Sequence, residues 1–333
     1  MTKFQIFIGI DISKSFFDIS YYWNGEAIYL GVYENSIEGF QSFIADLSSI
    51  VKVPSNKWFI CFENTGSYSK EILYFLISQD IPCLEESPLK ISRSLGLRRG
   101  KSDKIDSMDI CNYVYEKREK LSATILDHPT IIKLKILLSR RDLLVKQKSA
   151  LTVSLKEQNK SMDKDFYQDL LNDNKKIISH YTEHIKLIED KIIRIMKSDV
   201  QMFKNYKLLT SVVGIGPVTA AHLISTTNNF KKITDPRKYA CYCGVAPFPN
   251  QSGTKKGKTR VHNMANKKIK SLFSNCAIAA IIHDPQLSSY FRKKTKEGKE
   301  YGVVVNAIKN KLIQRAFAVI QRQSPYVKIL SYA

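Results

Sequence analysis

The sequence predicts an α/β domain over residues 1–125, a helical coiled-coil linker over 126–200 and a mainly helical domain over 201–333. Three observations predict this arrangement. Runs of β-branched and aromatic residues alternate with helical patterns in the first part, which is typical of a mixed sheet. A seven-residue apolar repeat follows, and the last part combines glycine turns with long helical patterns. With 333 residues, 44% of them hydrophobic, the chain can build more than one core.

The first domain is expected to open with a β-hairpin. Residues Phe4–Tyr22 form one β-prone run with Asp11 in its middle, which predicts a buried strand that carries an acid. A turn at Asn24 and Gly25 leads into the second strand. Ser36 is the expected N-cap of the first helix. The elements expected after the first strand are strand 27–33, helix 36–50, strand 58–63, helix 68–78, strand 81–84 and helix 102–115.

Four carboxylates stand out in this domain. Asp11 lies in the first strand and Glu63 ends a later one. Asp103 and Asp106 are three residues apart at a helix start, so they share one face of that helix. This is the layout of an RNase H-like active centre, where two divalent ions clamp the attacking and leaving oxygens of a phosphoryl transfer. We therefore expect these four acids to bind divalent metal ions.

Each acid also has a purely structural interpretation. Asp103 suits the positive end of a helix, Asp106 suits its surface, and Glu63 can cap the turn that follows it. Asp11 is harder to explain in this way, because an acid within an apolar strand is costly unless it is paired. Metal binding is favoured because it accounts for all four positions together.

The linker is expected to form long helices with an apolar seam. The polar stretch 161–176 is expected to contain the turn of an antiparallel helical hairpin or to lead into a dimerising one. The seam predicts a homo-oligomer, either a dimer or a tetramer, whereas an amphipathic helix packed on its own domain is the alternative. The seam consists of Leu137, Leu144 and Leu151, and then of Ile178, Tyr181, Ile185, Ile188, Ile192 and Ile195.

The third domain begins with a segment, Leu208–Ile224, that resembles a helix-hairpin-helix. Gly214 and Gly216 lie in its turn, and Pro217 starts the second helix. Glycines permit a tight turn, and the N–H groups of the next helix can hold a phosphate without reading base sequence. Two apolar helices joined by a glycine turn are the structural alternative.

A segment rich in proline and glycine, residues 239–263, is expected to be a loop that carries Ser252. A hydroxyl among cations is well placed to attack phosphorus, because positive charge stabilises a pentacovalent phosphorane. A turn residue or a simple phosphate donor is an equally good interpretation of Ser252. Helices expected at 266–282 and 302–322 have basic faces suited to a nucleic-acid backbone. The cations after the serine are Lys255, Lys256, Lys258 and Arg260.

Positive charge is concentrated in the third domain. The chain has a net charge of +21, and residues 201–333 hold 23 basic against 4 acidic residues. Residues 1–125 hold 14 basic against 16 acidic residues. This distribution predicts a polyanionic partner, since each neutralised phosphate releases counterions. A basic surface kept for solubility is the alternative.

No part of the sequence indicates a membrane or secretory protein. The first residues lack a signal pattern, and no apolar run approaches the ~20 residues of a membrane span. We expect a cytoplasmic location with reduced cysteines. A metal site that combines Cys241 and Cys243 with His222 or His262 is a weaker alternative, because the usual second pair of ligands is missing.

The motifs resemble those of transposases of the IS110 and IS1111 insertion-sequence group, over almost the full chain. The amino-terminal motifs are GIDISK around Asp11, FENTGSYS around Glu63, and KSDKIDSMD. The carboxy-terminal motifs are VVGIGPVTAA and YCGVAPFPNQSG, which contains Ser252. Ser107 and Ala265 depart from the alanine and glycine that are common in the family, which bears on local geometry rather than on chemistry.

The resemblance implies a RuvC-like domain with an acidic tetrad, a coiled-coil linker and a transposase domain with a nucleophilic serine. By motif, the four acids would bind magnesium and Ser252 would attack DNA. The resemblance further implies a covalent 5′-phosphoserine intermediate, a Holliday junction, and an oligomer that joins donor and target DNA. It also implies a structured noncoding guide RNA, so that base pairing selects the sites.

Two other functions compete with this RNA-guided recombinase. In a RuvC-like metal-dependent nuclease, the acids would activate water and Ser252 would only hold phosphate. In a nucleic-acid scaffold, the acids would be structural. Because the acids and the serine fall in different predicted domains, we expect composite sites in an oligomer.

Overall fold

The structure is a computed structural model, and the chain divides into two compact units, Met1–Leu126 and Asp127–Ala333. Each unit buries its own hydrophobic residues. No helix in the described part of the chain combines the length and the apolarity needed to cross a membrane. The structure describes residues 3–94, 96, 102–158, 163–252, 255–261 and 264–327.

The first unit contains a mixed five-stranded sheet in the order β3-β2-β1-β4-β5. The β1, β2 and β3 strands pair antiparallel, whereas β4 runs parallel to β1 and β5 runs parallel to β4. The α/β class expected from the sequence is therefore confirmed. The strands are β1 (Ile6–Ile12), β2 (Phe16–Trp23), β3 (Glu26–Glu34), β4 (Trp58–Glu63) and β5 (Cys83–Glu86).

Helices cover both faces of this sheet. One core packs α1 and α2 against the sheet, and a second core packs α3 and α4 against the other face. Ser36 caps α1 as expected, since its hydroxyl accepts a hydrogen bond from the Gly39 N–H at 3.3 Å. The helices of the unit are α1 (Ile37–Val51), α2 (Lys70–Ser78), α3 (Pro88–Ser94) and α4 (Asp103–Lys117), with a 3₁₀ turn at Ser55–Lys57.

The central strand, β1, is buried on both faces of the sheet, and its side chains alternate between the two cores. Ile6, Ile8 and Ile10 belong to the core that contains α1 and α2. Phe7 belongs to the core that contains α4. Because strand side chains alternate with a period of two, Asp11 lies on the same side of the sheet as Phe7 and α4.

The single strand predicted over Phe4–Tyr22 is wrong, because the chain turns back at Ser13–Ser15 and forms two strands there. The Ser13 hydroxyl donates to the Phe16 carbonyl at 2.7 Å, and the Ser13 N–H donates to the same carbonyl at 2.9 Å. A serine side chain thus closes a turn that has no glycine, proline or asparagine. The unit opens with a three-stranded antiparallel meander rather than a hairpin, and β5 lies two residues later than predicted.

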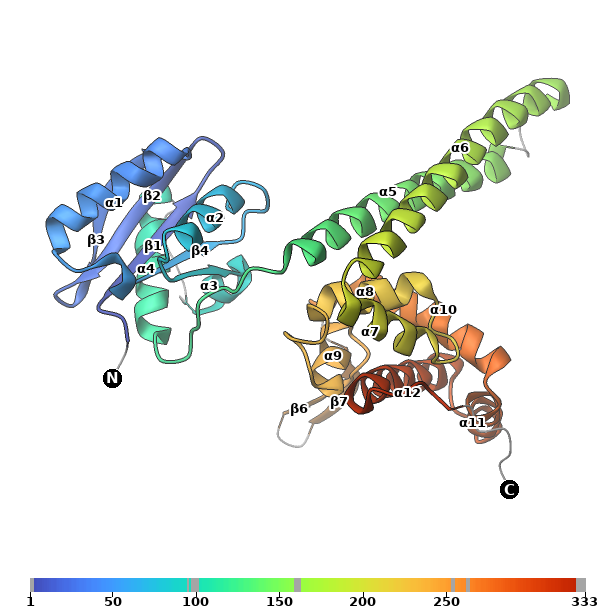
Figure 1. The fold of residues 1–333 in the computed structure, drawn as a ribbon. Helices are drawn as coiled ribbons and strands as arrows, with labels where there is room; N and C mark the ends of the chain where they lie inside the picture. The colour runs from blue at the N-terminus through green and yellow to red at the C-terminus, as the bar shows by residue number, and fades with distance from the viewer. Residues whose placement is uncertain are drawn as a thin grey trace. The chain divides into compact units, whose positions relative to one another are not determined.

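The second unit is mainly helical. The α5 and α6 helices form the expected antiparallel helical hairpin (Figure 1), in which Arg141 pairs with Glu189 at 2.6 Å and Lys148 donates to Thr182 at 2.7 Å. Most of the stretch 161–176 is helix from Lys164 onward, and residues 159–162 lie outside the described part. The helices are α5 (Pro129–Gln158), α6 (Lys164–Lys197), α7 (Val200–Thr210), α8 (Pro217–Thr227), α9 (Pro236–Tyr242), α10 (Lys267–His283), α11 (Pro285–Lys296) and α12 (Tyr301–Arg322).

The loop predicted at 239–263 is wrong in part. Its beginning belongs to α9, and an antiparallel ribbon, β6 (Phe248–Ser252) with β7 (Lys255–Arg260), follows. We call this ribbon the serine hairpin. Its strands lack the alternation of apolar and polar residues that identifies a half-buried strand, so the sequence pattern could not predict them. The α3 and α11 helices were not predicted either.

Gly9 is expected to be essential for the packing of the first unit. A Cβ at this position would overlap the backbone nitrogen of Cys111 and the backbone oxygen of Ser107, neither of which can rotate away. Gly9→Ala should therefore cost about 1–3 kcal/mol of unfolding free energy, as other overpacked sites do. Thermal unfolding followed by circular dichroism should show a melting temperature lower by about 5 °C or more.

Gly302→Ala is the matched control, because a Cβ on Gly302 would meet open space. This helical position should be neutral or slightly stabilising. Equal melting temperatures for Gly9→Ala and the wild type would contradict the close contact between α4 and β1.

Candidate active site

The site is built around Asp11, near the end of the central strand. In the antiparallel register, Asp11 lies opposite Asp18 of β2. The Tyr29 hydroxyl donates to the Asp18 carboxylate at 2.6 Å, so this second acid is held by β3. Asp11 itself is half-buried. Two strand acids therefore face each other at one end of the sheet.

Glu63 reaches the same end of the sheet because it is the last residue of β4. Since β4 runs parallel to β1 with Phe62 opposite Ile10, Glu63 comes beside Asp11. Its neighbour in the register on β5 is Glu86. That acid is buried and pairs with Lys90 at 3.0 Å, so it serves the structure of this edge.

The α4 helix brings the other two acids. Ser102 caps it, and Asp103 and Asp106 lie in its first turn. The close approach at Gly9 fixes the helix on β1, and the Ser107 hydroxyl lies 2.7 Å from the Ser20 hydroxyl of β2. These contacts hold the first turn of α4 over the end of β1 that carries Asp11.

The other three acids lie close enough to Asp11 for their charges to act on its carboxyl group. The pKa of Asp11 is raised to about 6, first by burial and then by the negative charges of Asp106, Asp103, Glu63 and Asp18. We call Asp11, Glu63, Asp103 and Asp106 the acid cluster. Ionising Asp11 is unfavourable here because like charges gather around a half-buried carboxyl group.

The donor chemistry of the acid cluster fits a hard divalent cation. Mg²⁺ and Mn²⁺ prefer carboxylate oxygens, and a cation would relieve the repulsion that raises the pKa of Asp11. Among the described residues, no group of three or more His, Cys, Asp or Glu side chains is already arranged as a metal site. The carboxylates would therefore have to turn toward a cation as it binds.

Ser252 is the last residue of β6 and is exposed. The register of the serine hairpin places Lys255 opposite Ser252 and Lys256 opposite Gln251. The other predicted cations, Lys258 and Arg260, follow on β7, and the side chains of these four residues lie outside the described part. The hydroxyl is thus presented to solvent on a strand whose partner is strongly basic.

The two glycines of the α7–α8 turn have different surroundings. Gly214 has φ +96°, and a Cβ there would come within 2.6 Å of the Cys276 carbonyl oxygen on α10. The Thr219 hydroxyl in the first turn of α8 lies 3.3 Å from the Cys276 thiol, which places the start of α8 against α10 as well. Packing alone therefore requires a glycine at 214, and phosphate binding at this turn stays a prediction.

The alternative metal site with His222 gains no support from its surroundings. His222 is buried, its Nε2 lies 3.7 Å from the Asp142 carboxylate, and Lys268 also pairs with Asp142. Burial and the nearby Arg141 lower the pKa of His222 to about 4, so the ring is neutral. Cys243 is buried, and His262 lies outside the described residues.

Sequence reasoning missed Gly9 and Asp18. Gly9 precedes Asp11 by two residues on a strand, so both lie on one face, and a glycine in a strand interior often marks a close backbone approach. That signal was available in the motif GIDISK. Asp18 was hidden because the two strands were read as one, which removed the register that sets it opposite Asp11.

Comparisons with known proteins match both units. A family model described as "Transposase", of the DEDD type of IS110 elements, matches residues 8–161, and one described as "Transposase IS116/IS110/IS902 family" matches 206–292. The chain is 25% identical to the "Pilin gene-inverting protein" of Moraxella bovis and to that of Moraxella lacunata, over 97% of this chain and 98% of each relative. It is 27% identical over 92 residues to an uncharacterized IS116 protein of Streptomyces clavuligerus, covering 28% of this chain and 23% of that protein.

Asp11→Asn is expected to stabilise the metal-free protein at neutral pH. In the folded protein the pKa of Asp11 is about 6, above its ordinary value of 3.8, so ionised Asp11 destabilises the fold. This loss of stability is absent below pH 4 and complete above pH 6. The unfolding free energy of the variant should exceed that of the wild type by about 1–3 kcal/mol at pH 7.5 and by little at pH 4. Melting temperatures measured across this range in a chelating buffer test the prediction.

The control is Asp80→Asn, an exposed acid in the same unit. Its melting temperature should follow the wild type at every pH. Millimolar Mg²⁺ should raise the melting temperature of the wild type at pH 7.5 and leave that of Asp11→Asn nearly unchanged. An increase in melting temperature from Asp11→Asn that is the same at pH 4 and pH 7.5 would contradict the raised pKa of Asp11.

Proposed function

Since this chain belongs to the IS110 family of insertion-sequence transposases and is therefore a DNA transposase or recombinase, we propose that it cuts and rejoins donor and target DNA through a covalent 5′-phosphoserine formed on Ser252. The observation that carries the proposal is the convergence of four acids around Asp11, in a chain that also presents an exposed serine opposite Lys255. The first feature suits metal-assisted phosphoryl transfer and the second suits nucleophilic attack.

In the proposed cleavage step, Ser252 Oγ forms a bond to phosphorus while the bond from phosphorus to the 3′ oxygen breaks. The serine proton passes to a base, and the departing 3′ oxygen takes up a proton. A 5′-phosphoserine and a free 3′ hydroxyl result. Rejoining reverses this exchange with a 3′ hydroxyl of the other duplex, so the phosphoester bond is conserved without an external energy source.

In the proposed site, Asp11, Glu63, Asp103 and Asp106 would hold Mg²⁺ or Mn²⁺. The cation would supply positive charge to the phosphate oxygens as negative charge develops on them. The protein contributes the placement of the ligands, because Gly9 and Ser107 fix the first turn of α4 over β1. Asp18, whose carboxylate accepts a hydrogen bond from the Tyr29 hydroxyl, lies opposite Asp11 on β2 and adds a further negative charge beside the site.

We further propose that a structured noncoding RNA guides the choice of sites, as the family resemblance implies. The excess of 23 basic over 4 acidic residues in 201–333 supports a protein that binds nucleic-acid backbones, whereas base pairing would supply the sequence specificity.

We propose that the active form is a homo-oligomer, a dimer or a tetramer, joined through the helical hairpin. Large apolar side chains remain exposed along its two helices. Leu187 on α6 is 52% exposed, and Ile136 on α5 is 62% exposed. A second copy of the hairpin would remove such surface from water, as in other helical assemblies.

Ser252→Ala is expected to abolish strand joining. Wild-type protein, candidate guide RNA, labelled donor DNA and Mg²⁺ should yield a protein-linked DNA band on a denaturing gel. Without the Oγ atom no phosphoserine can form, so the band should fall by at least about 10³-fold, the scale of losing a nucleophile. Gln251→Ala, an exposed neighbour on β6, should retain the band.

Cleavage that persists in Ser252→Ala without any linked band would instead identify a metal-dependent nuclease in which Ser252 only holds phosphate. Loss of cleavage in Asp11→Asn is expected under both mechanisms. The linked band therefore distinguishes them.

Replacing Ile136 and Leu187 together by lysine should lower the molar mass measured by light scattering to that of a smaller assembly. Both side chains are exposed, so the fold should tolerate the change, whereas like charges oppose self-association. Val200→Lys is the control, because Val200 is exposed but lies at the start of α7, outside the helical hairpin. An unchanged mass for the double variant would exclude the helical hairpin as the joining surface.

A further inference from the structure

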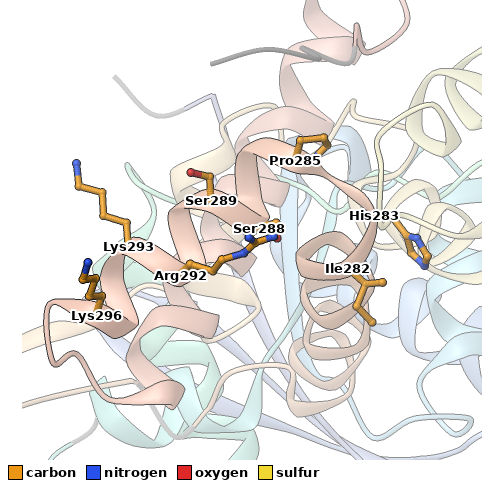
Figure 2. A pocket seen from close by; sticks show the side chains of 8 residues that line it. All are labelled: Ile282, His283, Pro285, Ser288, Ser289, Arg292, Lys293 and Lys296. Atoms are coloured by element: carbon orange, nitrogen blue, oxygen red, sulfur yellow. The ribbon is translucent and has the colours of Figure 1, made fainter. Parts of the chain in front are cut away.

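A basic cleft of about 610 Å³ lies where α10 meets α11, in a part of the second unit that the proposed chemistry does not use. Figure 2 shows Arg292 and Ser288 in its middle, Lys293 and Lys296 toward one end, and Ile282 with His283 at the other. The residues that line it are Ile282, His283, Pro285, Ser288, Ser289, Arg292, Lys293 and Lys296.

The cations of this cleft are not neutralised within the described structure. Arg292, Lys293 and Lys296 are exposed, and none of them pairs with a described carboxylate. Glu297 pairs with Lys294 at 2.7 Å. None of the three cations therefore forms an ion pair with a described carboxylate, although, after the hydrogen bond from Lys294, the charge of Lys293 helps to lower the pKa of Glu297.

Asp284, the acid at the start of α11, faces away from the cleft. It is buried, its carboxylate accepts a hydrogen bond from the Leu287 N–H at 2.9 Å, and it pairs with Arg315 at 2.8 Å. The Arg292 guanidinium instead donates to the Ser288 hydroxyl at 3.1 Å, one turn earlier on the helix. That contact orients the guanidinium along α11 and leaves its other N–H groups available to a ligand.

The helix dipole explains these cations only in part. Lys293 and Lys296 lie in the last turn of α11, where positive charge is favourable. Arg292 precedes that turn, and it lies four residues before Lys296, a spacing at which like charges repel one another on a helix. The helix dipole also does not explain why a cleft lies here, or why two serine hydroxyls line the basic cleft.

The opposite wall of the basic cleft is partly apolar. Ile282, in the last turn of α10, is 67% exposed, and Pro285 beside it is also exposed. A sugar–phosphate backbone presents both kinds of surface, because its phosphates are anionic and the carbons of its deoxyribose rings are apolar. Arginine binds phosphate with two parallel hydrogen bonds, and lysine binds it as a point charge.

We propose that the basic cleft binds the backbone of duplex DNA at a position outside the site of strand cleavage. The proposal rests on the proposed function, in which this chain holds donor and target DNA. Contacts of this kind position a duplex and carry no sequence information. DNA is favoured over RNA because the chain belongs to a transposase family, and transposases act on DNA.

The test is salt-dependent binding of the full-length protein to a fluorescent DNA duplex, measured by anisotropy in chelating buffer so that no cleavage occurs. The variant replaces Arg292, Lys293 and Lys296 by glutamine, which keeps helix propensity. Affinity should fall at least about tenfold, and the slope of log affinity against log salt should decrease by about 2–3, since each lost phosphate contact removes about 0.9.

The matched control replaces Lys146, Lys175 and Lys186 by glutamine. These exposed lysines of the helical hairpin give the same change in net charge. The control should change the slope by less than about 1, which corresponds to one phosphate contact. Arg292→Lys, which keeps the charge, should retain most of the slope. Equal weakening by the two triple variants would overturn the proposal, because net charge alone would then explain the loss.

An RNA duplex of matched length distinguishes the two polymers. The proposal requires the cleft variant to lose more affinity for DNA than for RNA, and the reverse result would overturn it. Failure of the proposed function is detected by the strand-joining assay and not by this binding assay, because Ser252→Ala should bind DNA as the wild type does here. Circular dichroism spectra and melting temperatures equal to those of the wild type establish that the variants are folded.

Discussion

The contact between α4 and β1 is the constraint on which the acid cluster depends. A helix can lie with its backbone directly on a strand only where the strand has no side chain, and Gly9 provides that gap. The contact fixes the height and direction of α4, because Gly9 faces backbone atoms of Cys111 and Ser107, which cannot rotate away. The Cys111 thiol adds a hydrogen bond to the Phe7 carbonyl at 3.4 Å. Asp103 and Asp106 therefore reach the end of β1 through rigid elements, as a precise ligand set requires.

Local patterns in the sequence predicted helices and strands better than they predicted which distant residues lie close together in space. The bounds of β4 and the cap of α1 follow from features within a few residues, such as Ser36. The turn at Ser13 closes through a hydroxyl, so its composition did not mark it. The raised pKa of Asp11 depends on strand order and register, which bring together residues about 90 positions apart, and no local pattern encodes them.

In the second unit, α10 has a comparable organising role. Its first turn carries Lys268, which pairs with Asp142 of α5, and its middle receives the turn between α7 and α8 at Cys276. Asn266, the N-cap of α10, donates its backbone N–H to the Tyr242 carbonyl at 2.9 Å. The end of α9, which precedes the serine hairpin, is thus tied to a helix that is fixed by several neighbours.

The length of the helical hairpin has a geometric consequence. At 1.5 Å per residue, the 34 residues of α6 extend about 51 Å, the length of roughly 15 base pairs of duplex DNA. In an assembly joined through such a rod, the spacing between catalytic units is measured in helical turns, and one added turn would move them apart by about 5.4 Å while rotating them little. If the proposed assembly forms through this rod, the length of the rod would set how far apart two duplexes are held before strand exchange.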